Sequence, residues 1–197
     1  MKENGAAKIF IVEDEAIILE SYRAILTDNG YQVVGCAYNG KQALDRIPRG
    51  EADLVLMDIN MPDMNGLDVL ERLSAEMRVP CVFITGYFDD ALIKRANGLG
   101  AFGYIIKPIQ EEQLLAAVRI ALQRAHEFSL LCKEVQDTKQ ALENRKVIER
   151  AKGILMKRQG LTEEVAMRLL QKKSADSNKK LVRIAEEILE ADRILGG

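Results

Sequence analysis

The sequence contains few of the residues that many catalytic and redox sites require. Its 197 residues include one histidine and three cysteines. The cysteines, Cys36, Cys81 and Cys132, have unrelated spacings and form no CxxC pair. Because Cys81 falls within an apolar strand-like run, this pattern favours buried free thiols over a disulfide or a cysteine-ligated metal. The one histidine, His126, lies in a helical segment, so no histidine is available for a catalytic dyad.

Long apolar runs are also missing. No run approaches the length needed to cross a bilayer, and residues 1–7 have none of the features of a signal peptide. We therefore expect a cytoplasmic protein with no membrane partner. Hydrophobic residues make up 48% of the chain and charged residues 29%, which suits a globular protein with a sizeable core. The length allows one and a half domains or two small ones.

Charge is unevenly distributed along the chain. Residues 1–142 carry 15 basic and 21 acidic side chains, a net charge of −6, whereas residues 143–197 carry 13 and 9, a net charge of +4. An acidic first part suggests a metal-binding module, and a basic second part suggests contact with an anion. The basic excess is equally compatible with an ordinary solvated helix surface.

Apolar strand-like runs alternate with helix-period segments over the first 125 residues. Such alternation predicts a parallel sheet that is covered by helices on both faces. Five units of this kind indicate an α/β fold with the flavodoxin-like, doubly wound strand order. The predicted strands span residues 8–12, 31–36, 53–57, 81–84 and 102–105, and the predicted helices span 15–28, 40–47, 66–76, 89–98 and a segment from 111 onward.

Polar and charged side chains accompany the ends of these predicted strands. Asp58 comes directly after Leu54-Val-Leu-Met57 and opens the run Asp58-Ile-Asn-Met-Pro-Asp-Met-Asn-Gly66. Ligands of doubly wound folds bind outside the carboxyl ends of the strands, so we expect these side chains to lie together. The set comprises Glu13, Asp14, Asp58, Thr85, Tyr104 and the pair Lys107-Pro108.

This set resembles the response-regulator receiver family, over residues 6–125. The resemblance implies that Asp58 is a phosphate-accepting nucleophile. Mg²⁺, which prefers oxygen ligands and keeps several waters, would be held by Glu13, Asp14, Asp58 and the backbone carbonyl of Asn60. Glu13 stands where many relatives have aspartate, and its extra methylene favours a contact through water.

The same resemblance implies roles for three further side chains. Lys107 would pair with Asp58 or with its phosphoryl group, and the peptide bond to Pro108 would be cis. The hydroxyl of Thr85 would move to a phosphoryl oxygen. Tyr104 would then enter the space that the threonine leaves.

Two enzyme classes fit the sequence less well. A dehalogenase-like phosphatase also uses an aspartate nucleophile, but it requires a second acid two residues later, where this chain has Asn60. A nucleotide-binding enzyme would have a glycine-rich loop after the first strand, whereas Val12-Glu-Asp-Glu15 is acidic there. We therefore expect that the protein is a phosphoryl acceptor and not an enzyme. Its own chemistry would be at most slow autophosphorylation and autodephosphorylation.

No flexible linker follows the predicted sheet. Between Glu111 and Arg158 there is no proline, and Gly153 is the only glycine. The last helix should therefore run on, with residues 111–142 forming a coiled-coil linker. A single amphipathic helix packed on its own domain is the alternative. Several stripe positions suit a seam poorly, so association would be weak, as in a regulated homodimer. The stripe comprises Leu114, Val118, Ala121, Ala125, Phe128, Cys132, Val135, Lys139 and Leu142.

Helix breakers divide the tail into three short helices, which predicts a small all-α bundle. Gly160 should end the first helix, and Thr162 should cap the second. Residues 176–178 should separate the second from a last helix at about 179–195. One face of each helix is apolar and should form the core, through Ile148, Ala151 and Leu155, then Ala166, Leu169 and Leu170, then Leu181, Ile184 and Ile188.

The run Ala151-Lys-Gly-Ile-Leu-Met156 and the residues after it resemble the ANTAR domain, the RNA-binding output of transcription antiterminators. Met167 stands where the family often has an aromatic residue, and Ala175 replaces a common methionine. Because residues 143–197 contain no aromatic residue, arginine stacking, hydrogen bonds or apolar contacts would have to replace aromatic stacking on bases. The candidate RNA-binding residues are Arg145, Lys146, Arg150, Lys152, Lys157, Lys172, Lys179, Lys180 and Arg183.

These features together predict a response regulator with a receiver domain over residues 1–125, an overlapping helical linker over 111–142 and a three-helix output domain over 143–197. A histidine kinase would phosphorylate Asp58, and phosphorylation would favour a homodimer that binds an RNA hairpin and causes transcription antitermination. A DNA-binding transcriptional regulator, or a protein-interaction regulator whose tail only dimerises, is the alternative.

Overall fold

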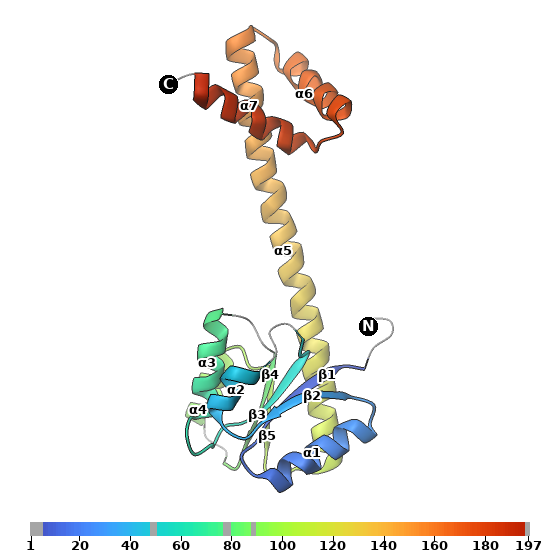
Figure 1. Ribbon diagram of the computed structural model, residues 1–197, viewed down its shortest axis with the longest axis vertical. Coiled ribbons are helices and arrows are strands. Elements are labelled where there is room, and N and C mark those ends of the chain that lie inside the picture. The colour runs from blue at the N-terminus through green and yellow to red at the C-terminus, as the bar shows by residue number, and fades with distance from the viewer. Residues whose placement is uncertain (1–5, 48–50, 77–79, 88–89, 196–197) are drawn as a thin grey trace. The chain divides into compact units, whose positions relative to one another are not determined.

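The computed structural model contains two compact units, residues 1–129 and 130–197. The first unit has strands and helices, and the second is helical (Figure 1). The long helix α5 (Glu111–Gln159) begins in the first unit and ends in the second. The structure describes residues 6–47, 51–76, 80–87 and 90–195.

The first unit is built on five parallel strands in the order β2-β1-β3-β4-β5. This is the flavodoxin-like order, so the predicted fold class is confirmed. The strands are β1 (Lys8–Val12), β2 (Gln32–Ala37), β3 (Leu54–Asp58), β4 (Cys81–Thr85) and β5 (Gly103–Ile106). The connecting helices are α1 (Ala16–Asp28), α2 (Gly40–Arg46), α3 (Gly66–Glu76) and α4 (Asp90–Gly98).

Alternate side chains of each strand enter two separate hydrophobic layers. In β1, Phe10 and Val12 pack with residues of α2, α3 and α4, whereas Ile9 and Ile11 pack with residues of α1 and α5. The helices lie on the corresponding faces of the sheet (Figure 1). Because both faces are covered, the inner strands are apolar throughout, and polar side chains gather only where the strands end.

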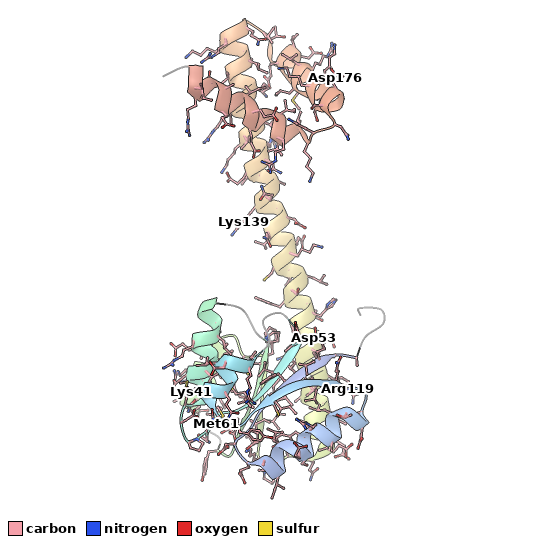
Figure 2. All side chains as sticks on the ribbon, in the orientation of Figure 1. Lys41, Asp53, Met61, Arg119, Lys139 and Asp176 are labelled. Carbon is pink, nitrogen blue, oxygen red and sulfur yellow. The ribbon has the colours of Figure 1, made fainter. Side chains whose placement is uncertain are left out.

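The beginning of α5 belongs to the second of these layers. Leu114, Val118 and Ala121 are almost completely buried there, so these positions of the heptad stripe serve the fold and are not available to a partner helix. Phe128 packs edge-on against Phe102, with ring centroids 6.0 Å apart. Later stripe positions are exposed, and Figure 2 shows Lys139 projecting from α5. These exposed positions are Cys132, Val135, Lys139 and Leu142.

The three cysteines are free, as predicted, but they differ in burial. Cys81 is fully buried in β4, and burial raises the pKa of its thiol. Cys36 is partly buried, and Cys132 is exposed on α5. The prediction of buried thiols is therefore wrong for Cys132, because it lies on a stretch of α5, residues 131–140, whose side chains are all exposed.

The second unit contains the end of α5 together with α6 (Glu163–Ser177) and α7 (Leu181–Leu195), as predicted. Thr162 caps α6 by accepting a hydrogen bond from the N–H of Val165 at 3.5 Å. Asn178 ends α6 in a left-handed conformation, with φ of 52°. The predicted apolar faces form the core, which contains Ile148, Leu155, Ala166, Leu169, Leu170, Leu181, Ile184 and Ile188.

Within the described ranges, no helix combines the length and the apolar character that spanning a bilayer would require.

Candidate functional site

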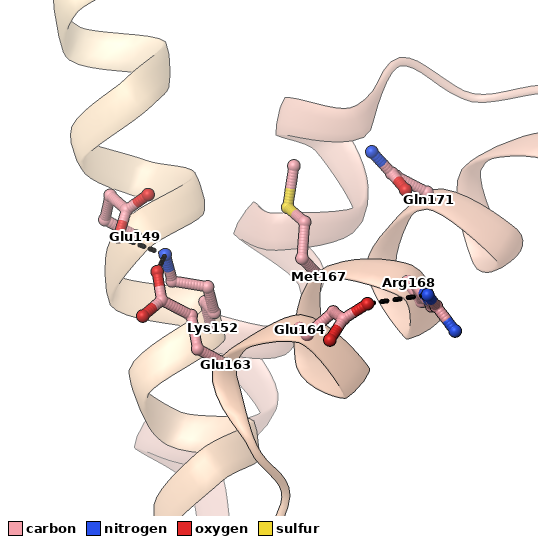
Figure 3. Close-up of a pocket in the computed structure, with 7 residues that line it drawn as sticks. All are labelled: Glu149, Lys152, Glu163, Glu164, Met167, Arg168 and Gln171. Atoms are coloured by element: carbon pink, nitrogen blue, oxygen red, sulfur yellow. Dashed lines mark hydrogen bonds and ion pairs between the residues drawn. The ribbon is translucent and has the colours of Figure 1, made fainter.

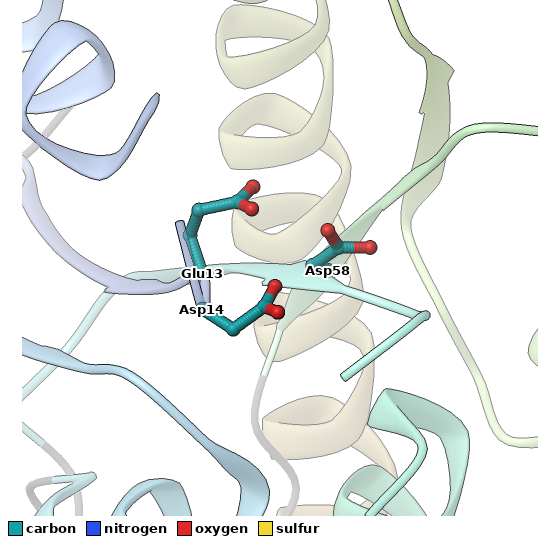
Figure 4. A group of neighbouring side chains, drawn as sticks. All are labelled: Glu13, Asp14 and Asp58. Carbon is teal, nitrogen blue, oxygen red and sulfur yellow. The ribbon is translucent and has the colours of Figure 1, made fainter. Parts of the chain in front are cut away.

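The carboxyl edge of the sheet brings together three acidic residues from the ends of two strands. Glu13 and Asp14 follow β1, and Asp58 is the last residue of the neighbouring strand β3. One carboxylate oxygen from each of the three lies within 4.8 Å of the others (Figure 4). Because β1 and β3 are parallel neighbours, this cluster follows directly from the strand order.

Lys107, which follows β5, forms ion pairs with two of these carboxylates. Its Nζ lies 2.5 Å from Oδ2 of Asp58 and 2.9 Å from the carboxylate of Glu13. The side chain of Asp58 is 5% exposed and that of Glu13 is 0% exposed. The Lys107-Pro108 bond is cis, as predicted. Two buried carboxylates therefore share one ammonium group, and the partly buried Asp14 beside them has no ion pair with Lys107.

Burial and charge perturb the titration of this cluster. Burial raises the pKa of Glu13 to about 7, although its hydrogen bond with Lys107 opposes the change. Burial also works against the charge on Lys107, but hydrogen bonds to Asp58 and Glu13 outweigh it and raise the pKa of that side chain. The negative charge of the cluster is thus only partly compensated by the protein.

The donor set fits a divalent cation such as Mg²⁺. All three acidic residues offer hard oxygen ligands, which Mg²⁺ prefers. In addition, both carboxylate oxygens of Glu13 depend on one ammonium group, since Nζ of Lys107 donates to Oε1 at 2.9 Å and lies 2.9 Å from Oε2. Oε2 is buried and forms no hydrogen bond of good geometry with any described residue, so a cation would add a favourable contact to a buried carboxylate.

Thr85 is the last residue of β4 and lies at the same edge, whereas Tyr104 is the second residue of β5 and pairs with Phe83; neither takes part in the carboxylate cluster. The hydroxyl of Thr85 donates to the backbone oxygen of Tyr87 at 3.1 Å and accepts from its N–H at 3.3 Å. Tyr104 is 44% exposed. Oδ1 of Asp58 accepts instead from the backbone N–H of Asn60 at 3.0 Å. In this arrangement one oxygen of Asp58 faces the loop and the other faces Lys107.

Two residues support the Asp58 loop through contacts that the sequence did not predict. Asp63 accepts hydrogen bonds from the first N–H groups of α2, those of Gly40 at 3.0 Å and Lys41 at 3.1 Å, and these bonds lower its pKa. Gly66 lies so close to β3 that a Cβ there would be 2.2 Å from the carbonyl oxygen of Asp58. The Pro62-Asp63 turn signal could have indicated a local contact, but not a partner 23 residues away.

The nine candidate RNA-binding residues do not share one environment. Lys152 is 8% exposed, and its Nζ lies 2.6 Å from Glu149 and 2.7 Å from Glu163. Figure 3 shows this bridge between α5 and the first turn of α6, beside a hollow that Met167 also lines. Lys152 therefore ties two helices together. The other eight are exposed on α5, on α6, in the segment before α7 and in the first turn of α7.

Ion pairs divide these eight exposed residues into two groups. Lys146 pairs with Glu143, Lys179 with Glu187, and Arg183 with Glu186. The others make no ion pair with any described residue, which leaves their charges available to a ligand. This second group comprises Arg145, Arg150, Lys157, Lys172 and Lys180.

Comparisons with known proteins agree with both halves of the chain. The response regulator receiver domain family matches residues 9–119, and the ANTAR domain family matches residues 136–189. The transcriptional regulatory protein PdtaR of Mycobacterium tuberculosis is 34% identical over 183 residues, which cover 93% of this chain and 89% of PdtaR. The response regulator protein TodT of Pseudomonas putida is 26% identical over an aligned region that covers 94% of this chain and 88% of TodT.

A solved structure supports the assignment of the first unit. The CheY-like receiver domain protein of Methanospirillum hungatei is 29% identical, with a TM-score of 0.57, over 62% of this chain and 98% of its own. The chain therefore belongs to the two-component response regulators, with a receiver domain followed by an ANTAR domain.

Proposed function

We propose that the protein is switched by phosphorylation of Asp58 and then binds an RNA hairpin as a homodimer, causing transcription antitermination. The observation that carries the proposal is the Asp58 carboxylate at the end of β3, held 2.5 Å from Lys107 and beside Glu13 and Asp14. A histidine kinase is the proposed phosphoryl donor, since a receiver domain is the acceptor half of a two-component system.

The residues around Asp58 have distinct roles in this proposal. A carboxylate oxygen of Asp58 attacks the phosphorus atom, while the bond from phosphorus to the donor breaks. Glu13, Asp14, Asp58 and the backbone carbonyl of Asn60 would hold Mg²⁺, which offsets the charge of the incoming phosphoryl group. Lys107 neutralises part of the same charge from the other side, because its ammonium group already faces Asp58.

The proposed switch starts from the present contacts of Thr85. Its hydroxyl exchanges hydrogen bonds with the backbone of Tyr87, and a phosphoryl oxygen on Asp58 would compete for that hydroxyl. Moving it would draw the loop after β4 inward and vacate space for the half-exposed ring of Tyr104. Phosphorylation would thereby change the surface beside β5 and α5.

Exposed apolar residues on α5 support a homodimer. Leu131, Val135, Thr138 and Leu142 follow a spacing of four, three and four residues, and the three large apolar ones are 53–60% exposed. This seam is more apolar than the predicted one through Cys132 and Lys139. In a parallel pair, Glu134 of one helix and Lys139 of the other would flank it with opposite charges. The seam is short, which suits an association that phosphorylation controls.

Two aspartates in this seam should keep the phosphorylated protein monomeric. We expect Val135→Asp with Leu142→Asp to abolish dimerisation, because four charges would face one another across the pair. Sedimentation before and after treatment with acetyl phosphate measures the effect, and Gln136→Asp with Gln140→Asp is the control for added charge. A dimer that survives the seam variant would contradict this interface. Val118→Asp is unsuitable, because Val118 is fully buried in the receiver core.

The choice of nucleic acid tests the output function. We expect the phosphorylated protein to bind a hairpin, selected from a random-loop RNA library, at least about a hundredfold more tightly than duplex DNA of the same sequence. Filter binding at several salt concentrations measures both affinities. Equal or tighter binding to the duplex would favour the DNA-binding alternative, and no binding to either would favour a regulator that acts through proteins.

A further inference from the structure

Gly153 occupies a position in α5 where the fold does not require glycine. It is exposed, lies six residues before the end of the helix, and a Cβ there would meet no atom within 4 Å. Gly66 differs, since a side chain there would collide with β3. Glycine inside a helix is less stable than alanine, because its backbone loses more freedom on folding. Gly153 therefore makes the helix less stable than alanine would, and no packing contact explains why glycine is present there.

Two unpaired cations lie on either side of this glycine. Arg150 is three residues before it and Lys157 four residues after it, so all three share one side of the helix. Both cations are exposed and form no ion pair with any residue that the structure describes. Glu149, the nearest acidic residue on the helix, is already held by Lys152 at 2.6 Å. The result is an exposed strip of helix surface that carries two positive charges and has no side chain at Gly153.

We propose that the phosphodiester backbone of RNA contacts α5 at Gly153, with Arg150 and Lys157 pairing with phosphates on either side. This proposal rests on the proposed RNA-binding function and names its docking face. The two cations are about 10 Å apart along the helix axis, far enough to reach different phosphates of one strand. The missing side chain lets a strand approach the helix backbone more closely than any other residue would allow.

Substitutions at Gly153 should change stability and binding in opposite directions. Gly153→Ala and Gly153→Leu are expected to raise the thermal midpoint of the second unit, because both residues favour helix. They should weaken binding of phosphorylated full-length protein to the library-selected hairpin, by about tenfold for Gly153→Leu and less for Gly153→Ala. Ala175→Leu, which adds similar bulk to an exposed position of α6, should leave binding unchanged. A purely structural role for Gly153 would not produce this divergence.

The salt dependence separates the glycine from the cations. Arg150→Gln should lower the slope of log affinity against log salt by about one unit, whereas Gly153→Leu should leave the slope unchanged. Wild-type affinity in Gly153→Leu would overturn the proposal while leaving RNA binding itself intact. Gly153→Leu protein that binds RNA normally but dimerises more weakly would also overturn the proposal. In that case the strip around Gly153 would contact a second copy of the chain and not RNA. Failure of the wild type to bind any library hairpin would instead refute the proposed function.

Discussion

Asp58→Asn is expected to abolish phosphorylation by acetyl phosphate while leaving the receiver domain folded. The amide is not a nucleophile, but it has nearly the same volume and can still accept the hydrogen bond from the N–H of Asn60. Lys107 retains Glu13 as a partner, at 2.9 Å. Intact-mass measurements should show one added phosphoryl group on the wild type and none on the variant, and circular dichroism should show unchanged secondary structure.

The control for this result is Asp45→Asn, which removes an exposed acid on α2 and should be phosphorylated like the wild type. Chelation of divalent cations should also stop labelling of the wild type, because the acidic cluster would then face the incoming phosphoryl group uncompensated. Undiminished labelling of Asp58→Asn at an acid-stable position would show that another residue is the acceptor.

Gly66→Ala should destabilise the receiver domain by about 3 kcal/mol, toward the upper end of what overpacking costs. The new methyl group would lie 2.2 Å from the carbonyl oxygen of Asp58 and 3.2 Å from Cα of Ile59. These are backbone atoms, so no side-chain rotation can relieve the contact, and the end of β3 must move. Phosphorylation should therefore slow as well, because Asp58 shifts with it. Urea unfolding and the rate of acetyl phosphate labelling measure the two effects.

Gly98→Ala is the matched control for this substitution. Gly98 is the last residue of α4, and a Cβ there would meet nothing within 4 Å. We expect its unfolding free energy to stay within about 1 kcal/mol of the wild type. Equal stability of Gly66→Ala and Gly98→Ala would mean that the β3–α3 loop yields easily, and that Gly66 does not fix the position of Asp58.

The fold could be predicted closely because each strand boundary is marked in the sequence. Every strand begins and ends within one residue of its predicted position, since an apolar run that is buried on both faces must stop where polar residues begin. The cluster of Glu13, Asp14, Asp58 and Lys107 followed from the same rule. Parallel strands place their carboxyl ends at one edge, so residues distant in sequence become neighbours without any knowledge of side-chain packing.

Features that depend on packing between helices could not be predicted in this way. The stripe from Leu114 to Leu142 has one continuous periodicity, yet its first part is buried in the receiver core and its later part is exposed. Periodicity identifies a face but not what covers it. Lys152 likewise seemed one basic residue among several, and its two carboxylate partners become evident only from the contact between α5 and α6.

The three cysteines differ in burial, so the rates at which a thiol reagent modifies them can report local exposure and unfolding of different parts of the protein. A thiol reagent can reach Cys132 in the native state, but it can reach Cys81 only when the central sheet comes apart. The raised pKa of Cys81 further suppresses its reactive thiolate. The modification rate of Cys81 therefore reports rare global unfolding of the receiver, whereas that of Cys132 reports shielding of α5. Both can be read from one unlabelled sample, without introducing a single mutation.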